Sequence, residues 1–148
     1  MNTGTSREAG AAADFAWPVR VYYEDTDAGG VVYHANYLKF MERARTEWLR
    51  ALGFEQDALR AAHGIVFAVR RLTVDMRRPA RFNDALAVTC RVRALRRASV
   101  EFEQAVLRDD EVLVSGEVAI ACVDVARQAP AAIPREVHEA MTALPGGG

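Results

Sequence analysis

The sequence has no long hydrophobic run and few cysteines. Its longest apolar stretches, such as Val118–Val123, are a handful of residues long, whereas a membrane-spanning helix needs about 20. The N-terminal residues lack a basic region followed by an apolar stretch, so we expect no secretory signal and a cytoplasmic location. Cys90 and Cys122 stand alone, without Cys-x-x-Cys or Cys/His spacing typical of a metal site. We therefore expect two reduced, buried thiols and no bound metal.

Several well-known catalytic motifs are also missing. The only serines are Ser6, Ser99 and Ser115, and none lies in a Gly-x-Ser-x-Gly motif. No glycine-rich phosphate loop or dinucleotide-binding fingerprint is present. His63 and His138 are isolated and are interpreted as surface or loop residues. These absences argue against serine hydrolases of the Gly-x-Ser-x-Gly type, P-loop enzymes and dinucleotide-dependent enzymes.

The overall charge is close to zero, but it is unevenly distributed. The 148 residues carry a net charge of −1, with 51% hydrophobic and 26% charged residues, which is typical of one globular domain. This balance predicts no recruitment of nucleic acid or acidic membranes. Residues 70–97 nevertheless carry nine Arg against two Asp, whereas residues 99–124 carry seven acidic residues against one Arg.

The periodicity of apolar residues predicts one long helix and five strands. The helix spans Asn36 to Leu52, with Asn36 as N-cap and Gly53 just beyond its C-terminus. The predicted strands are Val19–Tyr23, Ile65–Arg77, Ala85–Leu95, Ser99–Leu107 and Val112–Val125. Residues 1–14 and 145–148 are predicted to be flexible ends of a single domain over 15–144, whose last element is a short helix, Pro134–Leu144. Because short turns join the later strands, the expected fold is α+β, with a mainly antiparallel five-stranded sheet wrapped around the central helix.

The loop from Tyr22 to Tyr37 contains the most chemically informative residues. It reads Tyr-Tyr-Glu-Asp-Thr-Asp-Ala-Gly-Gly-Val-Val-Tyr-His-Ala-Asn-Tyr and joins the first strand to the long helix. The unpaired N–H groups and the positive dipole end of that helix would polarise a carbonyl placed beside them. Asp27 would stay ionised there and act as a base or nucleophile. The alternative is a structural turn that Asp side chains cap through the backbone; a calcium loop is disfavoured because Gly29 and Asn36 occupy ligand positions.

This loop and the helix after it, through Phe40-Met41-Glu42-Arg43-Ala44-Arg45-Thr46-Glu47, closely resemble the YbgC-type, Tol-Pal-associated acyl-CoA thioesterases. These belong with the 4-hydroxybenzoyl-CoA thioesterases in the hotdog-fold superfamily. The likeness covers residues 17–125; over the strands it is weaker but includes Pro79, Arg81 and Asp84. The resemblance implies the hotdog fold and hydrolysis of the thioester of acyl-CoA or acyl carrier protein, with CoA as part of the substrate and no cofactor.

The resemblance also implies roles for individual residues. Asp27 matches the family's catalytic carboxylate, which attacks the thioester carbonyl or activates a water molecule. The backbone N–H that holds the carbonyl falls on His34, with Tyr33 beside it, and the His34 side chain is expected to orient water or substrate. Arg96, Arg97 and Ser99 match an Arg-Arg-x-Ser segment that contacts the CoA phosphates; the alternative is a solvated hairpin with cross-strand pairs to Glu101 or Glu103.

Hotdog subunits join their sheets, so the resemblance implies a homodimer or homotetramer. A second chain is then expected to complete the site from the Ile65–Arg71 strand. Acyl-chain length depends on side chains such as Phe67, Phe102 and Met41, whose positions the sequence does not give. The main alternative function is a non-catalytic partner that binds acyl-CoA or acyl carrier protein. A hotdog dehydratase is disfavoured because it would need a histidine base in a different motif.

Overall fold

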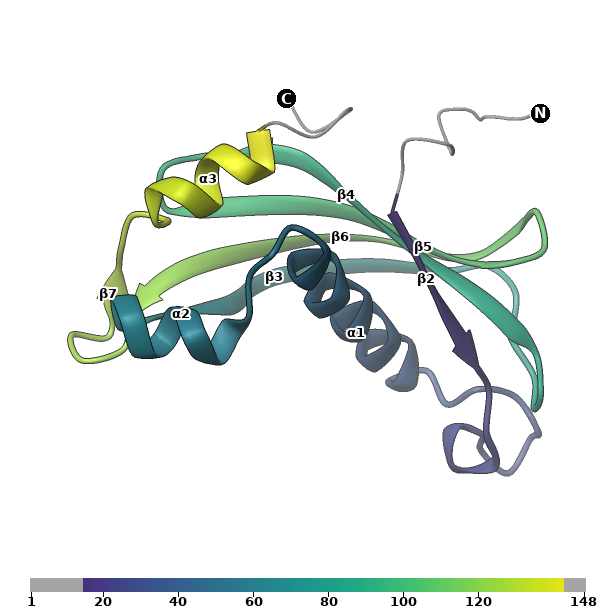
Figure 1. Ribbon diagram of the computed structural model, residues 1–148. Helices are drawn as coiled ribbons and strands as arrows, with labels where there is room; N and C mark the ends of the chain where they lie inside the picture. The colour runs from purple at the N-terminus through teal and green to yellow at the C-terminus, as the bar shows by residue number, and fades with distance from the viewer. Residues whose placement is uncertain (1–14, 143–148) are drawn as a thin grey trace.

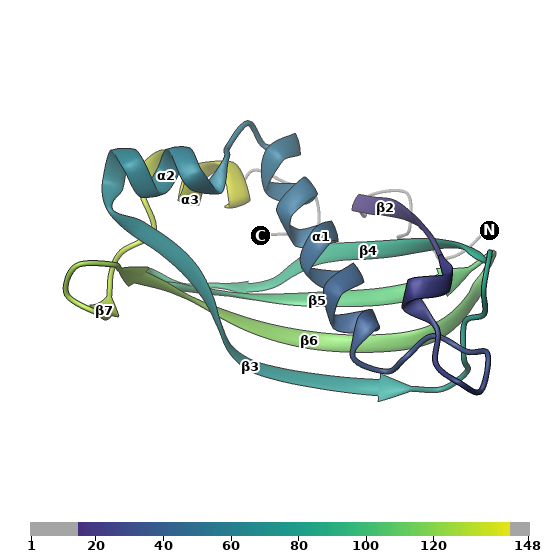
Figure 2. The same ribbon diagram turned by 90° about the horizontal axis from the view of Figure 1, so that it is seen from below.

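The computed structural model describes residues 15–142, which form a curled antiparallel sheet and three α-helices (Figure 1). The strands follow the order β2-β4-β5-β6-β3, and the two-residue strand β7 pairs with β6. The elements are β2 (Phe15–Arg20), α1 (Asn36–Ala51), α2 (Gln56–His63), β3 (Ile65–Met76), β4 (Ala85–Leu95), β5 (Ser99–Arg108), β6 (Glu111–Asp124), β7 (Ala129–Pro130) and α3 (Arg135–Thr142). Helix α1 lies across one face of the sheet (Figure 2), which confirms the predicted α+β architecture. The predicted flexible ends lie outside the described residues.

The apolar face of α1 packs on the inward-facing side chains of the sheet. The predicted alternation in β4 and β5 is confirmed, because the residues expected on the inner side are all buried: Leu86, Val88, Cys90, Val92, Val100, Phe102, Gln104 and Val106. Trp48 of α1 meets Phe102 of β5 edge-on, with 5.0 Å between ring centroids. Burial of this apolar surface stabilises the helix on the sheet.

The structure corrects two elements of the sequence prediction. The first strand runs over Phe15–Arg20, not Val19–Tyr23, because it pairs with β4 and that strand begins at Ala85, opposite Arg20. Tyr23 therefore has no partner strand, and Tyr23–Asp25 form a 3-10 turn. Helix α2 has no counterpart in the sequence prediction. It buries only Leu59 and ends at Gly64, whose φ of 67° suits glycine.

Strand β3 forms an edge of the sheet that α1 does not cover (Figure 2). Val69, Leu72 and Met76 on this strand are 53%, 37% and 46% exposed. A long edge strand with exposed apolar side chains is typical of a surface that pairs with another chain. Within residues 15–142, no helix is both long and apolar enough to cross a membrane.

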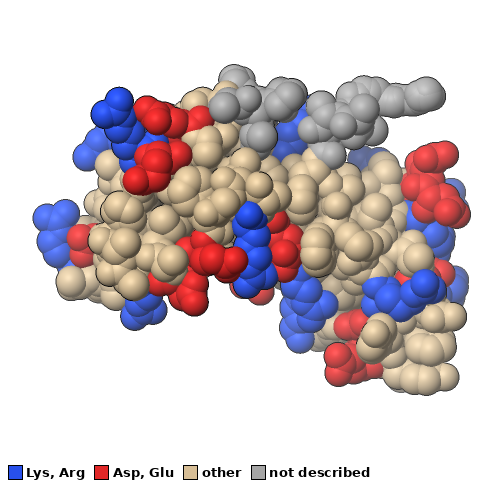
Figure 3. All heavy atoms as spheres, viewed as in Figure 1, with Lys and Arg blue, Asp and Glu red and all other residues tan. Residues whose placement is uncertain are grey.

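The two oppositely charged segments of the sequence neutralise each other in the fold. Glu101 of β5 lies within 4.0 Å of guanidinium nitrogens of Arg71, Arg93 and Arg96. The hydrogen bond from Arg96 is the largest influence that lowers the pKa of Glu101. On the face shown in Figure 3, basic and acidic side chains are accordingly interspersed.

Candidate active site

The loop between β2 and α1 is a tight hairpin that presents Asp27 at its tip. The N–H of Asp27 donates to the carbonyl of Val31 at 2.9 Å, and the N–H of Gly30 donates back to the Asp27 carbonyl at 3.0 Å. Gly30 has a φ of 82°, a conformation that favours glycine. Thr26 and Val32 form a β-bridge behind this turn. The backbone at Asp27 is therefore fixed from both sides.

The first aspartate of the loop is a structural anchor. Asp25 is only 6% exposed. Its Oδ2 accepts a hydrogen bond from the Tyr22 N–H at 2.9 Å, and its Oδ1 accepts one from the Asn36 side-chain amide at 2.8 Å. The prediction that Asn36 is the N-cap is wrong: Ala35 occupies that position, and Asn36 lies in the first turn. Asp25 thus ties the loop to the start of α1.

The second aspartate, Asp27, is exposed, and only one of its two carboxylate oxygens accepts a hydrogen bond from the described residues. Oδ1 of Asp27 accepts a hydrogen bond from the Gly29 N–H at 2.8 Å, as the structural-turn interpretation expects. Among the described residues, none donates a hydrogen bond to Oδ2. One carboxylate oxygen of Asp27 therefore holds the turn, and the other is left to meet a substrate or a water molecule.

The start of α1 places a backbone N–H beside this loop. The N–H of Tyr33 donates to the Asp25 carbonyl at 2.8 Å, so it is already used. The N–H of His34, in contrast, has no hydrogen-bond acceptor within residues 15–142. The rings of Tyr33 and His34 lie 4.5 Å apart, and both residues are exposed. Asp27, Tyr33 and His34 therefore lie on one loop, in which Asp27 is paired with Val31 and Tyr33 with Asp25.

A segment from Pro79 to Asp84 supports the loop from the other side. Ala80 accepts a hydrogen bond from the Val32 N–H at 2.8 Å and donates its own N–H to the buried hydroxyl of Tyr37 at 2.9 Å. Val31 forms a β-bridge with Arg81. The Arg81 N–H in turn donates to Asp84. Sequence reasoning missed these contacts, because the periodicity of α1 marks Tyr37 only as a core residue.

Asp84, at the end of this supporting segment, stays negatively charged. Burial alone would raise its pKa, but the hydrogen bonds from the Arg81 N–H and from Arg108, at 2.8 Å, hold the pKa of Asp84 below its usual value. Burial is the main reason that the pKa of the neighbouring Tyr37 hydroxyl is raised. Tyr37 therefore acts here as a neutral hydrogen-bond acceptor for Ala80.

Gly29 is the position at which a side chain would disturb Asp27 most directly. A Cβ atom added to Gly29 would lie 3.2 Å from Oδ1 of Asp27. We expect Gly29→Ala to reduce kcat/KM for the thioester hydrolysis that the resemblance implies by about three-fold or more, because small displacements of a reacting group are costly. Gly30→Ala is the contrast: its Cβ meets nothing within 4 Å, but its positive φ should cost about 1–2 kcal/mol of stability. Unchanged kinetics in Gly29→Ala would contradict the placement of Asp27.

The residues expected to bind CoA phosphates lie at the opposite end of the sheet from Asp27. Arg96 and Arg97 lie in the β4–β5 turn and Ser99 begins β5, and the 11 residues of β4 separate that turn from the Asp27 loop (Figure 1). At about 3.3 Å per residue this is a path of roughly 35 Å. Arg96 forms the predicted alternative contact, an ion pair with Glu101 at 2.8 Å. One chain therefore does not bring these residues to Asp27.

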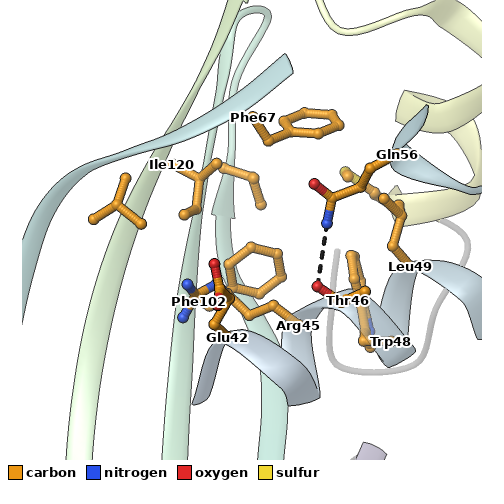
Figure 4. A pocket seen from close by; sticks show the side chains of 12 residues that line it. Glu42, Arg45, Thr46, Trp48, Leu49, Gln56, Phe67, Phe102 and Ile120 are labelled. Atoms are coloured by element: carbon orange, nitrogen blue, oxygen red, sulfur yellow. Dashed lines mark hydrogen bonds between the residues drawn. The ribbon is translucent and has the colours of Figure 1, made fainter. Parts of the chain in front are cut away.

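A groove between α1 and β3, called here the α1–β3 groove, contains two cavities. The near cavity, of about 260 Å³, begins at Leu38 in the first turn of α1 and includes Met41. The far cavity, of about 90 Å³, lies between α1, α2 and the sheet, and its walls include Phe67 and Phe102 (Figure 4). The three side chains expected to shape an acyl pocket thus line this groove. Within residues 15–142, no cluster of three His, Cys, Asp or Glu is suited to bind a metal.

Comparison with known proteins identifies the family. The family model of the thioesterase-like superfamily matches residues 21–141. The acyl-CoA thioesterase YbgC of Haemophilus influenzae is 48% identical over 126 residues, which cover 85% of this chain and 93% of that protein. The acyl-CoA thioester hydrolase YbgC of Escherichia coli O157:H7 is 47% identical over 124 residues, covering 83% and 92%.

A solved structure supports the same assignment. The crystal structure of a probable thioesterase from Bartonella henselae, 36% identical, superposes with a TM-score of 0.79 and covers 82% of this chain and 100% of that one. The chain therefore belongs to the thioesterase-like superfamily, has the hotdog fold and is an enzyme of the thioester hydrolase class. The resemblance drawn from the loop and the helix is confirmed.

Proposed function

We propose that this chain hydrolyses the thioester of acyl-CoA to a free acid and CoA. The observation that carries the proposal is the presence of two unengaged groups on one loop: Oδ2 of Asp27, which no described residue engages, and the N–H of His34, which has no acceptor among them. The names of the YbgC relatives, an acyl-CoA thioesterase and an acyl-CoA thioester hydrolase, support the same substrate class.

In this mechanism the His34 N–H polarises the thioester carbonyl at the positive end of α1. Asp27 then acts in one of two ways. As a nucleophile, its Oδ2 bonds to the carbonyl carbon, the C–S bond breaks, CoA leaves, and water hydrolyses the resulting mixed anhydride. As a general base, it takes a proton from water, the hydroxide adds to the carbonyl, and the proton passes to the departing CoA sulfur. The side chains of Tyr33 and His34 are exposed, and their proposed role is to orient the substrate or that water.

The test is release of free thiol from a panel of short, long and aromatic acyl-CoAs. Turnover would support the proposed function and rank the acyl groups. If CoA esters are not cleaved, the same assay with acyl carrier protein thioesters asks whether the carrier differs. Saturable binding of acyl-CoA without thiol release would contradict hydrolysis and favour the alternative, a non-catalytic binding partner.

The expected location of the protein is the cytoplasm. Cys90 and Cys122 are buried and form no disulfide bond, as expected for thiols in a reducing compartment.

We infer that the complete site is assembled from more than one subunit. Arg96, Arg97 and Ser99 are too far along the sheet to serve the Asp27 of their own chain, so any CoA phosphates they bind belong to a substrate at another subunit's Asp27. Arg97 is better placed for this than Arg96, which is paired with Glu101. The exposed edge strand β3 gives the surface through which two chains would join their sheets.

The protein is therefore expected to be a homodimer, or a homotetramer made of two such dimers, at micromolar concentration. Met76→Glu, which places a charge in the exposed apolar row of β3, should raise the dimer dissociation constant at least about ten-fold, because the charge would lose its hydration at the interface. Thr142→Glu, at an exposed position on α3, is the matched control. Analytical ultracentrifugation distinguishes the outcomes, and a monomeric wild-type protein would contradict the assembly.

A further inference from the structure

A charged side chain divides the α1–β3 groove into its two cavities. Leu38, Glu42, Arg45 and Leu49 follow one another at helical spacing and lie on one face of α1. The two ends of this stripe are apolar and its middle is charged. Glu42, Arg45 and Val69 line both cavities, whereas Leu38 lines only the near cavity and Leu49 only the far one. Arg45 therefore stands at the boundary between the cavities.

The guanidinium of Arg45 is held in place by a buried amide. Its Nη1 donates to Oε1 of Gln104 at 2.9 Å. Gln104 is 2% exposed, and its Nε2 donates to the carbonyls of Met41 at 3.0 Å and Thr89 at 3.2 Å. The side chain of Gln104 is thus fixed between α1 and the sheet, and it fixes Arg45 in turn.

Arg45 has no close anionic partner in the described part of the chain. No carboxylate oxygen of residues 15–142 lies within 4.0 Å of its guanidinium. Burial lowers the pKa of Arg45, and the electrostatic influences of Cys90 and of Glu42 counter this only in part. A partly buried cation without an ion-pair partner depends on its remaining hydration. Covering it with methylene groups would remove that hydration without offering a hydrogen bond in exchange.

The walls on either side of Arg45 are suited to hydrocarbon. The apolar residues of the near cavity are Leu38, Met41, Val69, Leu72 and Val118. Those of the far cavity are Trp48, Leu49, Phe67, Val69, Val100, Phe102, Ile120 and Met141 (Figure 4). The near cavity begins at the N-terminal end of α1, the end that follows the Asp27 loop. An acyl chain whose thioester lies at that loop would fill the near cavity first and meet Arg45 next.

We propose that Arg45 determines the acyl-chain length that this enzyme accepts. Chains that end in the near cavity bind without covering the guanidinium, and longer chains are rejected because they must pass it to reach the far cavity. Gln104 acts as a positioning residue that holds Arg45 across the groove. This inference rests on the proposed hydrolysis of acyl-CoA and identifies the substrate class at the same site.

The test compares kcat/KM over straight-chain saturated substrates from acetyl-CoA to palmitoyl-CoA. Arg45→Met should raise the ratio of long-chain to short-chain kcat/KM by about ten-fold or more, the scale on which a pocket discriminates small changes in chain length. Arg45→Lys should keep the wild-type preference, because the charge remains. Arg43→Met, on an exposed part of α1 outside both cavities, is the matched control and should leave the ratio unchanged.

A second variant and a binding assay test the role of Arg45 if Arg45→Met does not fold or if the wild-type protein does not cleave acyl-CoA. If Arg45→Met does not fold, Arg45→Gln, which removes the charge but keeps a polar group, should shift the ratio in the same direction. If wild-type protein cleaves no acyl-CoA, the hydrolysis proposal fails. Calorimetric binding of non-hydrolysable acyl-CoA thioethers of increasing length then tests the groove by itself. An unchanged long-to-short ratio in folded Arg45→Met, in turnover or in binding, would overturn the role of Arg45.

Discussion

Asp27→Asn is expected to lower kcat/KM for acyl-CoA by about 10²-fold or more and to leave the fold intact. Asparagine keeps a side-chain oxygen to accept the hydrogen bond from the Gly29 N–H, so the hairpin should survive. What it loses is the negative charge on the second oxygen, which both mechanisms require. Thiol-release kinetics together with thermal unfolding separate the chemical loss from any structural one.

Asp57→Asn is the matched control for this change. Asp57 is also exposed, and its Oδ1 also accepts a backbone hydrogen bond, from Ala58 at 2.9 Å. It lies on α2, outside the Asp27 loop, so its replacement should leave kcat/KM unchanged. If Asp27→Asn retained kcat/KM within about three-fold of wild type, the carboxylate would not be the reacting group, and the mechanism would have to be abandoned.

Asp25→Ala is expected to reduce the free energy of unfolding by about 2–4 kcal/mol and also to lower activity. The substitution leaves the Tyr22 N–H and the Asn36 amide without the buried carboxylate that accepts from both, and hydrogen bonds to a charged group contribute about 1.5–3 kcal/mol each. Activity should fall because the loop is no longer tied to the start of α1. Chemical denaturation and the thiol-release assay measure the two effects.

Asn36→Ala provides the comparison for Asp25→Ala. It removes only one of the two side-chain contacts and leaves the Tyr22 N–H paired, so its effect on stability should be clearly the smaller of the two. A pattern in which Asp25→Ala unfolds like wild type while Asp27→Asn is destabilised would reverse the roles assigned here. It would show that the exposed aspartate, and not the buried one, anchors the loop.

The structural roles of the two aspartates could not be separated from the sequence. Asp25 and Asp27 lie two residues apart in the same polar loop, and either could cap a turn. The resemblance pointed to Asp27, but the physical difference is tertiary: Asp25 is buried against Asn36, whereas Asp27 extends to the tip of the hairpin. Burial depends on contacts between the loop and α1, which no local pattern encodes.

Periodic elements were predictable because their pattern is local. The bounds of β4, Ala85–Leu95, are those expected from alternation, and α1 ends within one residue of its prediction. In each case one face meets the core, and the sequence records that face at a period of 2 or 3.6 residues. The specific loop and helix motif also sufficed to identify the thioesterase-like superfamily.

Features that depend on pairing between distant segments were decided only by the tertiary structure. Strand β2 ends opposite the first residue of β4, so the tyrosines that follow β2 were wrongly predicted as part of the strand. The arginines of the β4–β5 turn lie far from Asp27 because an entire strand separates them. Arg45 meets Gln104 across 59 residues of chain. Sequence alone determined the class of chemistry, whereas long-range packing decided which atoms face a substrate, because contact and burial are properties of the folded chain.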